Sequence, residues 1–245
     1  MKKRISVCIA TYNGASYVKE QLESILIAIG EDDEVIISDD NSTDHTIAII
    51  ESLNDTRIKI IMNDKTNSGH VRNFENALKH SKGDIIFLSD QDDVWHPAKA
   101  KKMVSALEKN DVVVCNCFVV DQNLNEIGAS FFTLKNSGKG FFKNLYKNSF
   151  LGCCMAFKRP ILEKALPFPK DIISHDTWIG LIGECYGETI FISDQLHYFR
   201  RHGDNFSVSN DEDSMSGDYS PYSFFEKLKM RLILLKNIVF RLLRR

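Results

Sequence analysis

The chain has 245 residues, of which 43% are hydrophobic and 26% charged, an ordinary composition for one globular domain or one domain with a short appendage. Lys and Arg number 31 and Asp and Glu number 33, so the formal charge of -2 gives no reason to expect a nucleic-acid partner. The six cysteines form no C-x-x-C pair and lie mostly in apolar runs, which argues against a zinc site and favours buried thiols.

The first predicted element is a short apolar run, Ile5–Ala10, which a polar turn follows directly. This run is too short for the core of a signal peptide. Nowhere does the sequence reach the roughly 20 consecutive apolar residues that a membrane-spanning helix needs. We therefore expect the protein in the cytoplasm.

Short apolar runs alternate with longer amphipathic ones through residues 1–115. Runs rich in Ile and Val with nearly continuous hydrophobicity are typical of strands covered on both faces, as in a parallel sheet. The predicted strands are Ile5–Ala10, Glu34–Ser38, Arg57–Met62, Asp84–Ser89 and Val112–Cys115. The predicted helices between them are Ser16–Ile29, Thr43–Leu53, Val71–His80 and Pro97–Lys109. This alternation predicts a Rossmann-like α/β half.

The alternation ends there, and residues 116–204 are assigned to a second half of the same domain. Residues 121–149, rich in Asn, Gly, Lys and Phe, predict loops with short strands or helices. The sequence then predicts a strand at Phe150–Lys158, a helix at Asp176–Tyr186, and strands at Thr189–Ser193 and Leu196–Arg201. Residues 205–223 have few apolar anchors and predict a flexible loop.

Polar clusters follow three of the predicted strands, at Thr11–Gly14, Asp39–Asp44 and Asp90–Asp93. The carboxyl ends of parallel strands meet at one edge of an open sheet, where ligands bind. One such cluster is a common turn, but three from different strands would converge on one crevice. The sequence therefore predicts a ligand site at this edge.

The cluster Asp90–Asp93 holds three carboxylates within four residues. They repel one another unless they are solvated or share a cation, and the hard cations Mg²⁺ and Mn²⁺ prefer such oxygen ligands. The alternative is a solvated turn in which Asp92 or Asp93 caps the helix that begins near Pro97. We favour the cation site because an apolar strand delivers the cluster to the ligand edge.

The cluster Asp39–Asp44 has two compatible interpretations. Asn41 or Ser42 could cap the next helix, with Asp44 favourable in its first turn. We expect Ser42 and Asp44 to start the helix while Asp40 faces the crevice. The Asp40 carboxylate could then accept a hydrogen bond from a pyrimidine imide N–H.

At these residues the sequence resembles the family 2 glycosyltransferases of the GT-A fold, over about residues 4–203. The motifs that carry the resemblance are, in order, Ser6–Gly14, Asp39–Asp44, Asn67–Gly69 and Ser89–Trp95. The resemblance implies a mixed, mostly parallel sheet flanked by helices. It also implies a metal-dependent enzyme that inverts the anomeric centre, with residues 1–115 binding a nucleotide-sugar and residues 116–204 serving the acceptor and catalysis.

The resemblance assigns the donor site residue by residue. Thr11, Tyr12 and Asp40 match positions that hold the nucleotide, and Asn13 lies in the same motif. Asp90 and Asp92 match the Asp-x-Asp motif, with Asp92 as the metal ligand and Asp90 near the ribose. The segment Tyr198–Asn205 resembles a late motif of the family, which places Arg201 and His202 at the departing diphosphate, with His202 as a further candidate metal ligand. A basic turn at the sheet edge is the alternative.

The resemblance assigns the general base to Asp176, which opens a predicted helix in the second half. Many relatives have Glu-Asp at this point, where this chain has His175 and Asp176. The alternative is an Asp that caps the helix beside a surface His. Gly152 resembles a position beside the acceptor and the donor sugar, where glycine allows close backbone approach. We place His175 and Trp178 on the same acceptor side.

Residues 224–245 predict a basic amphipathic helix. Its apolar residues recur at helical spacing: Leu228, Leu232, Leu235, Val239 and Leu242. Many of the remaining residues are Lys or Arg, and Glu226 is the only acid, a pattern typical of helices that lie on a membrane surface. The alternative is a helix that docks its apolar stripe on the domain or on a second subunit. We place peripheral contact with the inner face of the plasma membrane first, because it would hold polyprenyl-linked acceptors there.

The segment Ser89–Trp95 looks most like that of bacterial rhamnosyltransferases of surface-polysaccharide synthesis, so dTDP-rhamnose is the first expected donor and a UDP-hexose the alternative. The expected acceptor is a glycan or a polyprenyl-linked glycan. A nucleotidyltransferase would normally add an early Gly-rich basic loop, whereas Thr11–Ser16 has one Gly and no Lys or Arg. A non-catalytic nucleotide-sugar-binding module is the third reading, and in it Asp176 would be dispensable.

Overall fold

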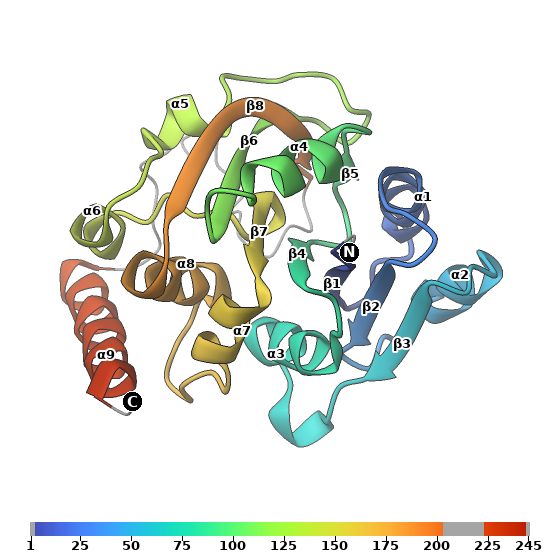
Figure 1. Ribbon diagram of the computed structural model, residues 1–245. Coiled ribbons are helices and arrows are strands. Elements are labelled where there is room, and N and C mark those ends of the chain that lie inside the picture. The colour runs from blue at the N-terminus through green and yellow to red at the C-terminus, as the bar shows by residue number, and fades with distance from the viewer. Residues whose placement is uncertain (1–2, 203–222, 244–245) are drawn as a thin grey trace.

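A computed structural model describes residues 3–202 and 223–243 of the chain (Figure 1). The strands are β1 Ile5–Thr11, β2 Glu34–Asp39, β3 Ile58–Met62, β4 Ile85–Ser89, β5 Val94–Trp95, β6 Val112–Val120, β7 Met155–Lys158 and β8 Thr189–Arg200. The helices are α1 Val18–Ala28, α2 Thr46–Ser52, α3 His70–His80, α4 Lys99–Ala106, α5 Phe131–Lys135, α6 Phe141–Tyr146, α7 Arg159–Ala165, α8 His175–Tyr186 and α9 Phe224–Leu243. Two short 3₁₀ helices are η1 Lys65–Asn67 and η2 Gly152–Cys154.

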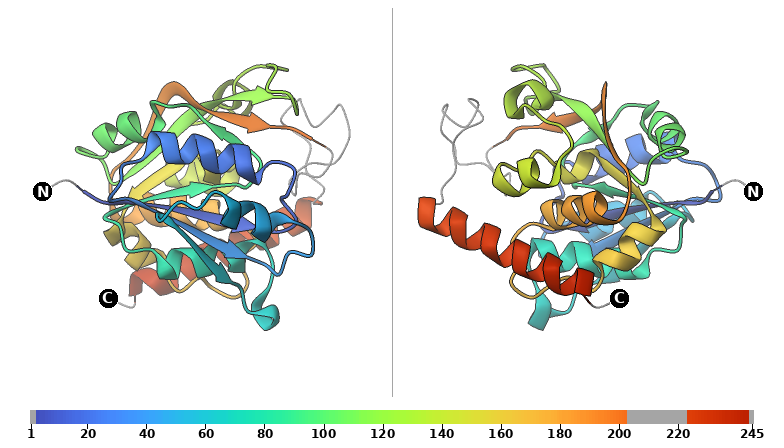
Figure 2. Two further views of the ribbon diagram at one scale, coloured as in Figure 1. Left: turned by 90° about the vertical axis from the view of Figure 1, so that its right-hand side faces the viewer. Right: turned by 60° about the vertical axis from the view of Figure 1, so that its left-hand side comes forward.

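The strands form a single mixed sheet in the order β3-β2-β1-β4-β7-β6-β8-β5. Strands β3, β2, β1 and β4 are mutually parallel, and β8 runs parallel to β6. Strand β7 is antiparallel to both β4 and β6, and β5 is antiparallel to β8. Helices α1 and α4 cover one face, and α3 and α7 the other (Figure 2). The predicted α/β class with a mostly parallel sheet is confirmed.

The continuous apolar runs that predicted strands covered on both faces are buried, as expected. Every residue of β1, β2 and β4 is buried, so both faces of these strands are covered by helices. The expectation of buried thiols holds for Cys8, Cys115, Cys117, Cys153 and Cys154, whereas Cys185 is only partly buried. Carboxyl ends of the parallel strands therefore emerge from a closed apolar layer into the polar loops after β1, β2 and β4.

The second half departs from the prediction. Strand β6 continues to Val120, and Thr189–Arg200 is one strand, not two. The sequence ended one predicted strand at Ser193 and began the next at Leu196. In the structure Ser193 and Asp194 are exposed where the long strand β8 curves, beside register shifts in its pairing with β6 (Figure 1). Predicted strand Phe150–Lys158 is split into η2 and β7, and α7 was not predicted.

Helix α9 packs on the domain beside α6 and α8 (Figure 2). Leu234 and Ile238 are buried, Arg241 donates to the carbonyl oxygens of Leu166 and Pro167, and Arg231 donates to the carbonyl oxygen of Tyr146 at 2.6 Å. The helix therefore docks on the domain, as the alternative expected, but not through the apolar stripe that the alternative named.

The apolar stripe that the periodicity selected in α9 is not the face that docks. Leu228, Leu232, Leu235 and Val239 are exposed. The docking and outward faces of the helix both carry apolar residues. Within residues 3–202 and 223–243, no helix has both the length and the apolarity needed to cross a bilayer.

Candidate active site

The acidic loop, residues 90–93, joins β4 to β5 and is fixed at both ends. The side-chain amide of Gln21 in α1 donates to the Ser89 hydroxyl and, at 2.8 Å, to the carbonyl oxygen of Asp90. The indole N–H of Trp95 donates to the same Ser89 hydroxyl at 3.0 Å. These buried hydrogen bonds give the loop a defined conformation at the edge of the sheet.

Gln91 joins the acidic loop to the turn after β1. Its side-chain oxygen accepts from the backbone N–H of Tyr12 at 2.9 Å, and its amide nitrogen donates to the Tyr12 carbonyl at 3.0 Å. A Cβ atom at Gly14 would lie 2.3 Å from the same oxygen, so glycine is needed for this approach. In the Asp-x-Asp motif Gln91 is only the variable position between Asp90 and Asp92. The sequence could not predict its contact with Tyr12, because the ends of β1 and β4 become neighbours only in the folded sheet.

The structure brings Asp176 of α8 to the acidic loop. Burial raises the pKa of Asp90 well above that of an ordinary carboxyl, and the negative charges of Asp93, Asp92 and Asp176 raise it further. These groups raise the pKa because each disfavours a second negative charge nearby. The carboxylates predicted for the metal and for the base are therefore electrostatic neighbours.

His202 lies against Asp92. Its Nε2 is 3.0 Å from the Asp92 Oδ2, with the side chains 6% and 16% exposed. The imidazole ring also lies 4.6 Å from the ring of Tyr17, measured between centroids. The two residues predicted as metal ligands thus adjoin one another at the rim of the acidic loop, although 110 positions separate them in the chain.

Arg201, predicted at the diphosphate, follows directly after β8 and is partly buried. Its backbone N–H donates to the carbonyl oxygen of Val120 at 2.8 Å. Burial lowers the pKa of its guanidinium, because the charged form is less well hydrated there. Its guanidinium lies 6.0 Å from the ring centroid of Phe199, and the next residue, His202, is the one that adjoins Asp92.

The loop after β2 is organised by two aspartates with different roles. Asp39 is buried and accepts hydrogen bonds from the hydroxyl of Thr11 at 2.8 Å and from the Ser42 N–H at 2.7 Å. Asp40 is partly buried and accepts from the Asn63 side chain at 2.9 Å and the Gly69 N–H at 2.8 Å. Asp40 thereby ties this loop to the segment that leads into α3.

These contacts correct two expectations. The Thr11 side chain is fully buried beneath the loops, so it supports Asp39 and does not line an open crevice. Ser42 does not cap α2, because its hydroxyl accepts from the Asn13 N–H at 2.8 Å; the Thr46 N–H that begins the helix is bound by Asp44. Tyr12 is 56% exposed and lies at the rim.

Asn13 was assigned through the family resemblance and Asp44 through the pattern of a helix start, and their contacts join the turn after β1 to the loop after β2. The side-chain oxygen of Asn13 accepts from the Thr43 N–H at 2.9 Å, and Asp44 accepts from the Ala15 N–H at 3.1 Å. Asn13 has a positive φ of 47°, a left-handed conformation that Asn tolerates better than most residues. The rim of the site is therefore one hydrogen-bonded surface.

The start of α8 holds the remaining predicted residues. Ser174 is the N-cap, and its hydroxyl accepts from the Thr177 N–H. Oδ1 of Asp176 also accepts from the Thr177 N–H, at 2.6 Å. The alternative, in which Asp176 caps the helix, is therefore wrong: Ser174 is the cap, Asp176 lies in the first turn of α8, and its charge acts on Asp90.

His175 is buried, and not the surface residue that the capping interpretation required. Its ring stacks on Phe74 at 4.0 Å and meets His70 edge-on at 5.0 Å, between ring centroids. Burial lowers the pKa of His175 well below its ordinary value. A Cβ atom at Gly152 would lie 2.9 Å from the His175 Nε2, so Gly152 is required for this close packing.

From the sequence, His70 is expected either to face the donor or to be a solvated helix residue, and the structure shows that it is partly buried and lies within the electrostatic reach of Asp176 and Asp92. Burial lowers its pKa, while the charges of Asp176 and Asp92 raise it. Trp178, in contrast, does not lie on the acceptor side. It is fully buried in the core, with its indole N–H donated to the Ala165 carbonyl in α7 at 3.0 Å.

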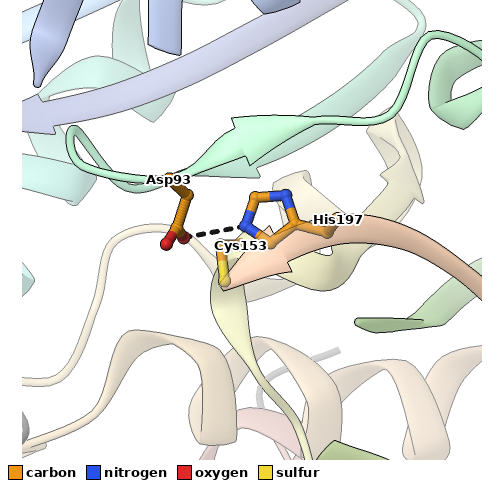
Figure 3. Close-up of side chains that lie close together, drawn as sticks. All are labelled: Asp93, Cys153 and His197. Atoms are coloured by element: carbon orange, nitrogen blue, oxygen red, sulfur yellow. Dashed lines mark hydrogen bonds and ion pairs between the residues drawn. The ribbon is translucent and has the colours of Figure 1, made fainter. Parts of the chain in front are cut away.

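Among the described residues, one buried cluster has ligand atoms close enough to hold a metal: Asp93, Cys153 and His197, within 4.8 Å of one another (Figure 3). The ammonium of Lys99 already donates to the His197 Nδ1 at 3.0 Å. Its positive charge disfavours a cation beside it. The more exposed pair of Asp92 and His202 fits a divalent cation that also binds a ligand, because carboxylate and imidazole are both suitable donors for Mn²⁺.

The chain matches the glycosyl transferase family 2 model over residues 6–166. It is 28% identical to an uncharacterised glycosyltransferase of Nostoc sp. (84% of this chain, 67% of the relative), and 35% identical to the dTDP-rhamnosyl transferase RfbG of Shigella flexneri (68% and 58%). It is 26% identical to the Escherichia coli enzyme WfgD, a UDP-Glc:alpha-D-GlcNAc-diphosphoundecaprenol beta-1,3-glucosyltransferase (67% and 64%). The chain thus spans 58% to 67% of the length of these relatives.

Two solved structures are similar in fold. Staphylococcus aureus TarS 1-349 in complex with UDP-GlcNAc has a TM-score of 0.70 at 20% identity, covering 96% of this chain and 67% of that one. Glucosyl-3-phosphoglycerate synthase of Mycobacterium tuberculosis, with Mn²⁺, UDP and phosphoglyceric acid, has a TM-score of 0.59 at 18% identity, covering 98% and 78%. The fold is GT-A, as the resemblance implied. The chain belongs to glycosyl transferase family 2.

Proposed function

We propose that the protein transfers a sugar from a nucleoside-diphosphate donor to a glycan or lipid-linked acceptor, with inversion at the anomeric carbon and with Mg²⁺ or Mn²⁺. The observation that carries the proposal is the meeting of Asp90 and Asp92 with Asp176 from α8. A carboxylate cluster that raises the pKa of its own member is a typical feature of a cation-dependent or acid–base site. The Mn²⁺-bound synthase of the same fold supports the choice of cation.

In this proposal Asp92 and His202 hold the cation, and Arg201 contacts the diphosphate. The bound cation would neutralise charge that develops on the leaving diphosphate. Tyr12, Asn13 and Asp40 line the rim at which the nucleoside binds, with Asp90 near the ribose. His175 and Gly152 shape the acceptor side next to Asp176.

Asp176 accepts the proton of the acceptor hydroxyl as its oxygen attacks the anomeric carbon. The bond between that carbon and the donor diphosphate breaks in the same displacement, and the nucleoside diphosphate leaves with the bonding electron pair. A single displacement from the face opposite the leaving group inverts the configuration. The base holds the proton on Oδ2, because Oδ1 accepts from the Thr177 N–H.

The donor that we propose first is dTDP-rhamnose, with a UDP-hexose as the alternative. The segment Ser89–Trp95 and the similarity to RfbG support the first, and the similarity to WfgD supports the second. The test is a screen of nucleotide sugars, with and without Mn²⁺, for thermal stabilisation and for slow donor hydrolysis. Stabilisation by one donor only when Mn²⁺ is present supports the proposal. Failure of every donor and of Mn²⁺ itself refutes it.

Binding of Mn²⁺ is expected to depend on pH through Asp90. Its raised pKa means that this carboxyl still carries a proton at pH values where an ordinary Asp is ionised, and protons compete with the cation. In the cation-free protein the folded state binds the extra proton, so this group's contribution to stability falls as pH rises through the raised pKa. Saturating Mn²⁺ should therefore raise the melting temperature by about 5–10 °C at pH 8 and by much less at pH 5.5.

The measurement is differential scanning fluorimetry at both pH values, with Asp90→Asn as the control. The Asn variant has no titrating group at this position, so its response to Mn²⁺ should change less with pH. An identical Mn²⁺ effect at pH 5.5 and pH 8 in the wild-type protein would contradict the assignment.

We further propose that the outward face of α9 contacts an anionic membrane surface. Leu228, Leu232 and Val239 are exposed along this face. Lys229 and Lys236 line an open surface groove together with Leu228 and Leu232. Apolar residues flanked by lysines are typical of helices at the interface of anionic lipids. The names of two relatives specify undecaprenol-linked acceptors, which supports the same location.

Replacing Leu228, Leu232 and Val239 together by Gln should abolish sedimentation with vesicles that contain phosphatidylglycerol, because the buried apolar area is lost. The docking residues Leu234 and Ile238 stay intact, so the fold should be retained. The matched control is Ile27→Gln, an apolar residue 74% exposed on α1 at the opposite side of the molecule (Figure 1). Equal sedimentation of the triple variant and the wild type would show that this face does not bind membranes.

A further inference from the structure

Lys99, the first residue of α4, is fully buried. Its ammonium donates to the carbonyl oxygen of Cys153 at 2.6 Å and to the Nδ1 of His197 at 3.0 Å. It also lies 4.2 Å from the ring centroid of Trp95, close enough for a cation–π interaction. A buried charge is tolerated only where its hydrogen bonds are satisfied, so these partners account for its position.

The direction of the hydrogen bonds follows from the chemistry of the groups. An ammonium only donates, so the His197 Nδ1 accepts, and in a neutral imidazole the proton then lies on Nε2. That Nε2 is 2.7 Å from the Asp93 Oδ2, to which it donates (Figure 3). The other oxygen of Asp93 accepts from the Arg200 N–H at 2.8 Å. Both oxygens of the last carboxylate in the acidic loop are thus fixed from β8.

We infer that Lys99 is the positioning residue of the acidic loop, acting through His197 and Asp93. The inference rests on the proposed function, since it concerns how Asp92 is presented to the cation. Asp93 is bonded directly to Asp92, so a rotation of its carboxylate would move the neighbouring backbone. The same ammonium donates to the Cys153 carbonyl in η2, where Gly152 packs against His175. Lys99 therefore connects the acidic loop to the start of α8, where Asp176 lies.

The first test is Lys99→Met, which keeps an apolar chain of similar length and removes the charge. We expect its affinity for Mn²⁺, titrated calorimetrically in the presence of dTDP, to fall about 10–100-fold, the usual effect of losing a group that orients a metal ligand. Turnover should fall to a similar degree. The matched control is Lys102→Met on the same helix; that side chain is 50% exposed and pairs with Asp194, so both quantities should stay at wild-type values.

A second pair of variants tests the connection itself and decides the matter if Lys99→Met does not fold. His197→Gln can still donate an amide N–H to Asp93, so its affinity for Mn²⁺ should stay within about tenfold of the wild type. His197→Leu has no such donor, and its affinity for Mn²⁺ should fall as far as that of Lys99→Met. A purely structural role predicts lower melting temperatures with unchanged Mn²⁺ affinity, and that result overturns the inference. If the wild-type protein binds no Mn²⁺, the proposed function fails as well, so the two failures are distinguishable.

Discussion

Replacing Asp92 by Ala is expected to reduce kcat about 100–1000-fold, the scale of losing one preorganised electrostatic stabiliser of a transition state. Asp92 is the carboxylate of the acidic loop that adjoins His202, and its side chain is 16% exposed, open enough to contact a ligand. Without it the proposed cation loses an oxygen ligand, and the charge on the leaving diphosphate is less well stabilised. Initial rates over a range of Mn²⁺ concentrations would measure the effect.

The Asp92→Ala variant should also require more Mn²⁺ for half-maximal activity, which separates a metal ligand from a residue that merely supports the loop. Asp194→Ala is the matched control, because Asp194 is an exposed carboxylate on the bend of β8 that pairs with Lys102. Its kinetics should match those of the wild type. A normal kcat and a normal Mn²⁺ requirement in Asp92→Ala would remove this residue from the site.

Replacing Asp176 by Asn is expected to lower kcat about 10²–10⁴-fold, the usual contribution of a general base. The Asn oxygen can still accept from the Thr177 N–H, so the start of α8 should keep its structure. The affinities for Mn²⁺ and for the donor should stay close to those of the wild type, because in the proposal this residue contacts the acceptor hydroxyl and not the diphosphate. Single-turnover rates and calorimetry would test the two expectations separately.

Loss of turnover with retained affinity for Mn²⁺ and donor in Asp176→Asn would distinguish a transferase from a module that only binds nucleotide sugars. Asp171→Asn is a suitable control, since Asp171 is an exposed carboxylate five positions earlier that accepts from Asn237 of α9. Transfer at the wild-type rate by Asp176→Asn would assign the base to another residue. Loss of donor affinity together with turnover would place Asp176 at the donor instead.

The first half of the fold could be predicted because its signals are local. Strands β1, β2 and β4 are continuous apolar runs, and such runs are buried whichever residues cover them. The second half was less predictable. In β8 a polar pair sits at a bend within one strand, and a bend has the same local composition as a turn.

The candidate site also has a part that the sequence could predict and a part that it could not. The sequence located Asp90–Asp93 at the carboxyl end of a strand, but it could not distinguish the roles of the three carboxylates. Asp93 is buried and bound by His197, which lies 104 positions away, whereas Asp92 is at the rim beside His202. Nothing local separates two adjacent aspartates, since their surroundings come from β8.

By itself, the sequence determined the α/β class, the strands of the parallel half, the acidic edge and the family, because each depends on hydrophobic pattern or motif order along the chain. Only the tertiary structure decided that Lys99 is buried, that Thr11 supports Asp39, and that the predicted apolar stripe of α9 faces outward. Burial and hydrogen-bond partners are properties of residues that are distant in sequence. The sequence around a lysine in an amphipathic helix is the same whether its ammonium is in water or buried against a strand, so the sequence could not predict the burial of Lys99.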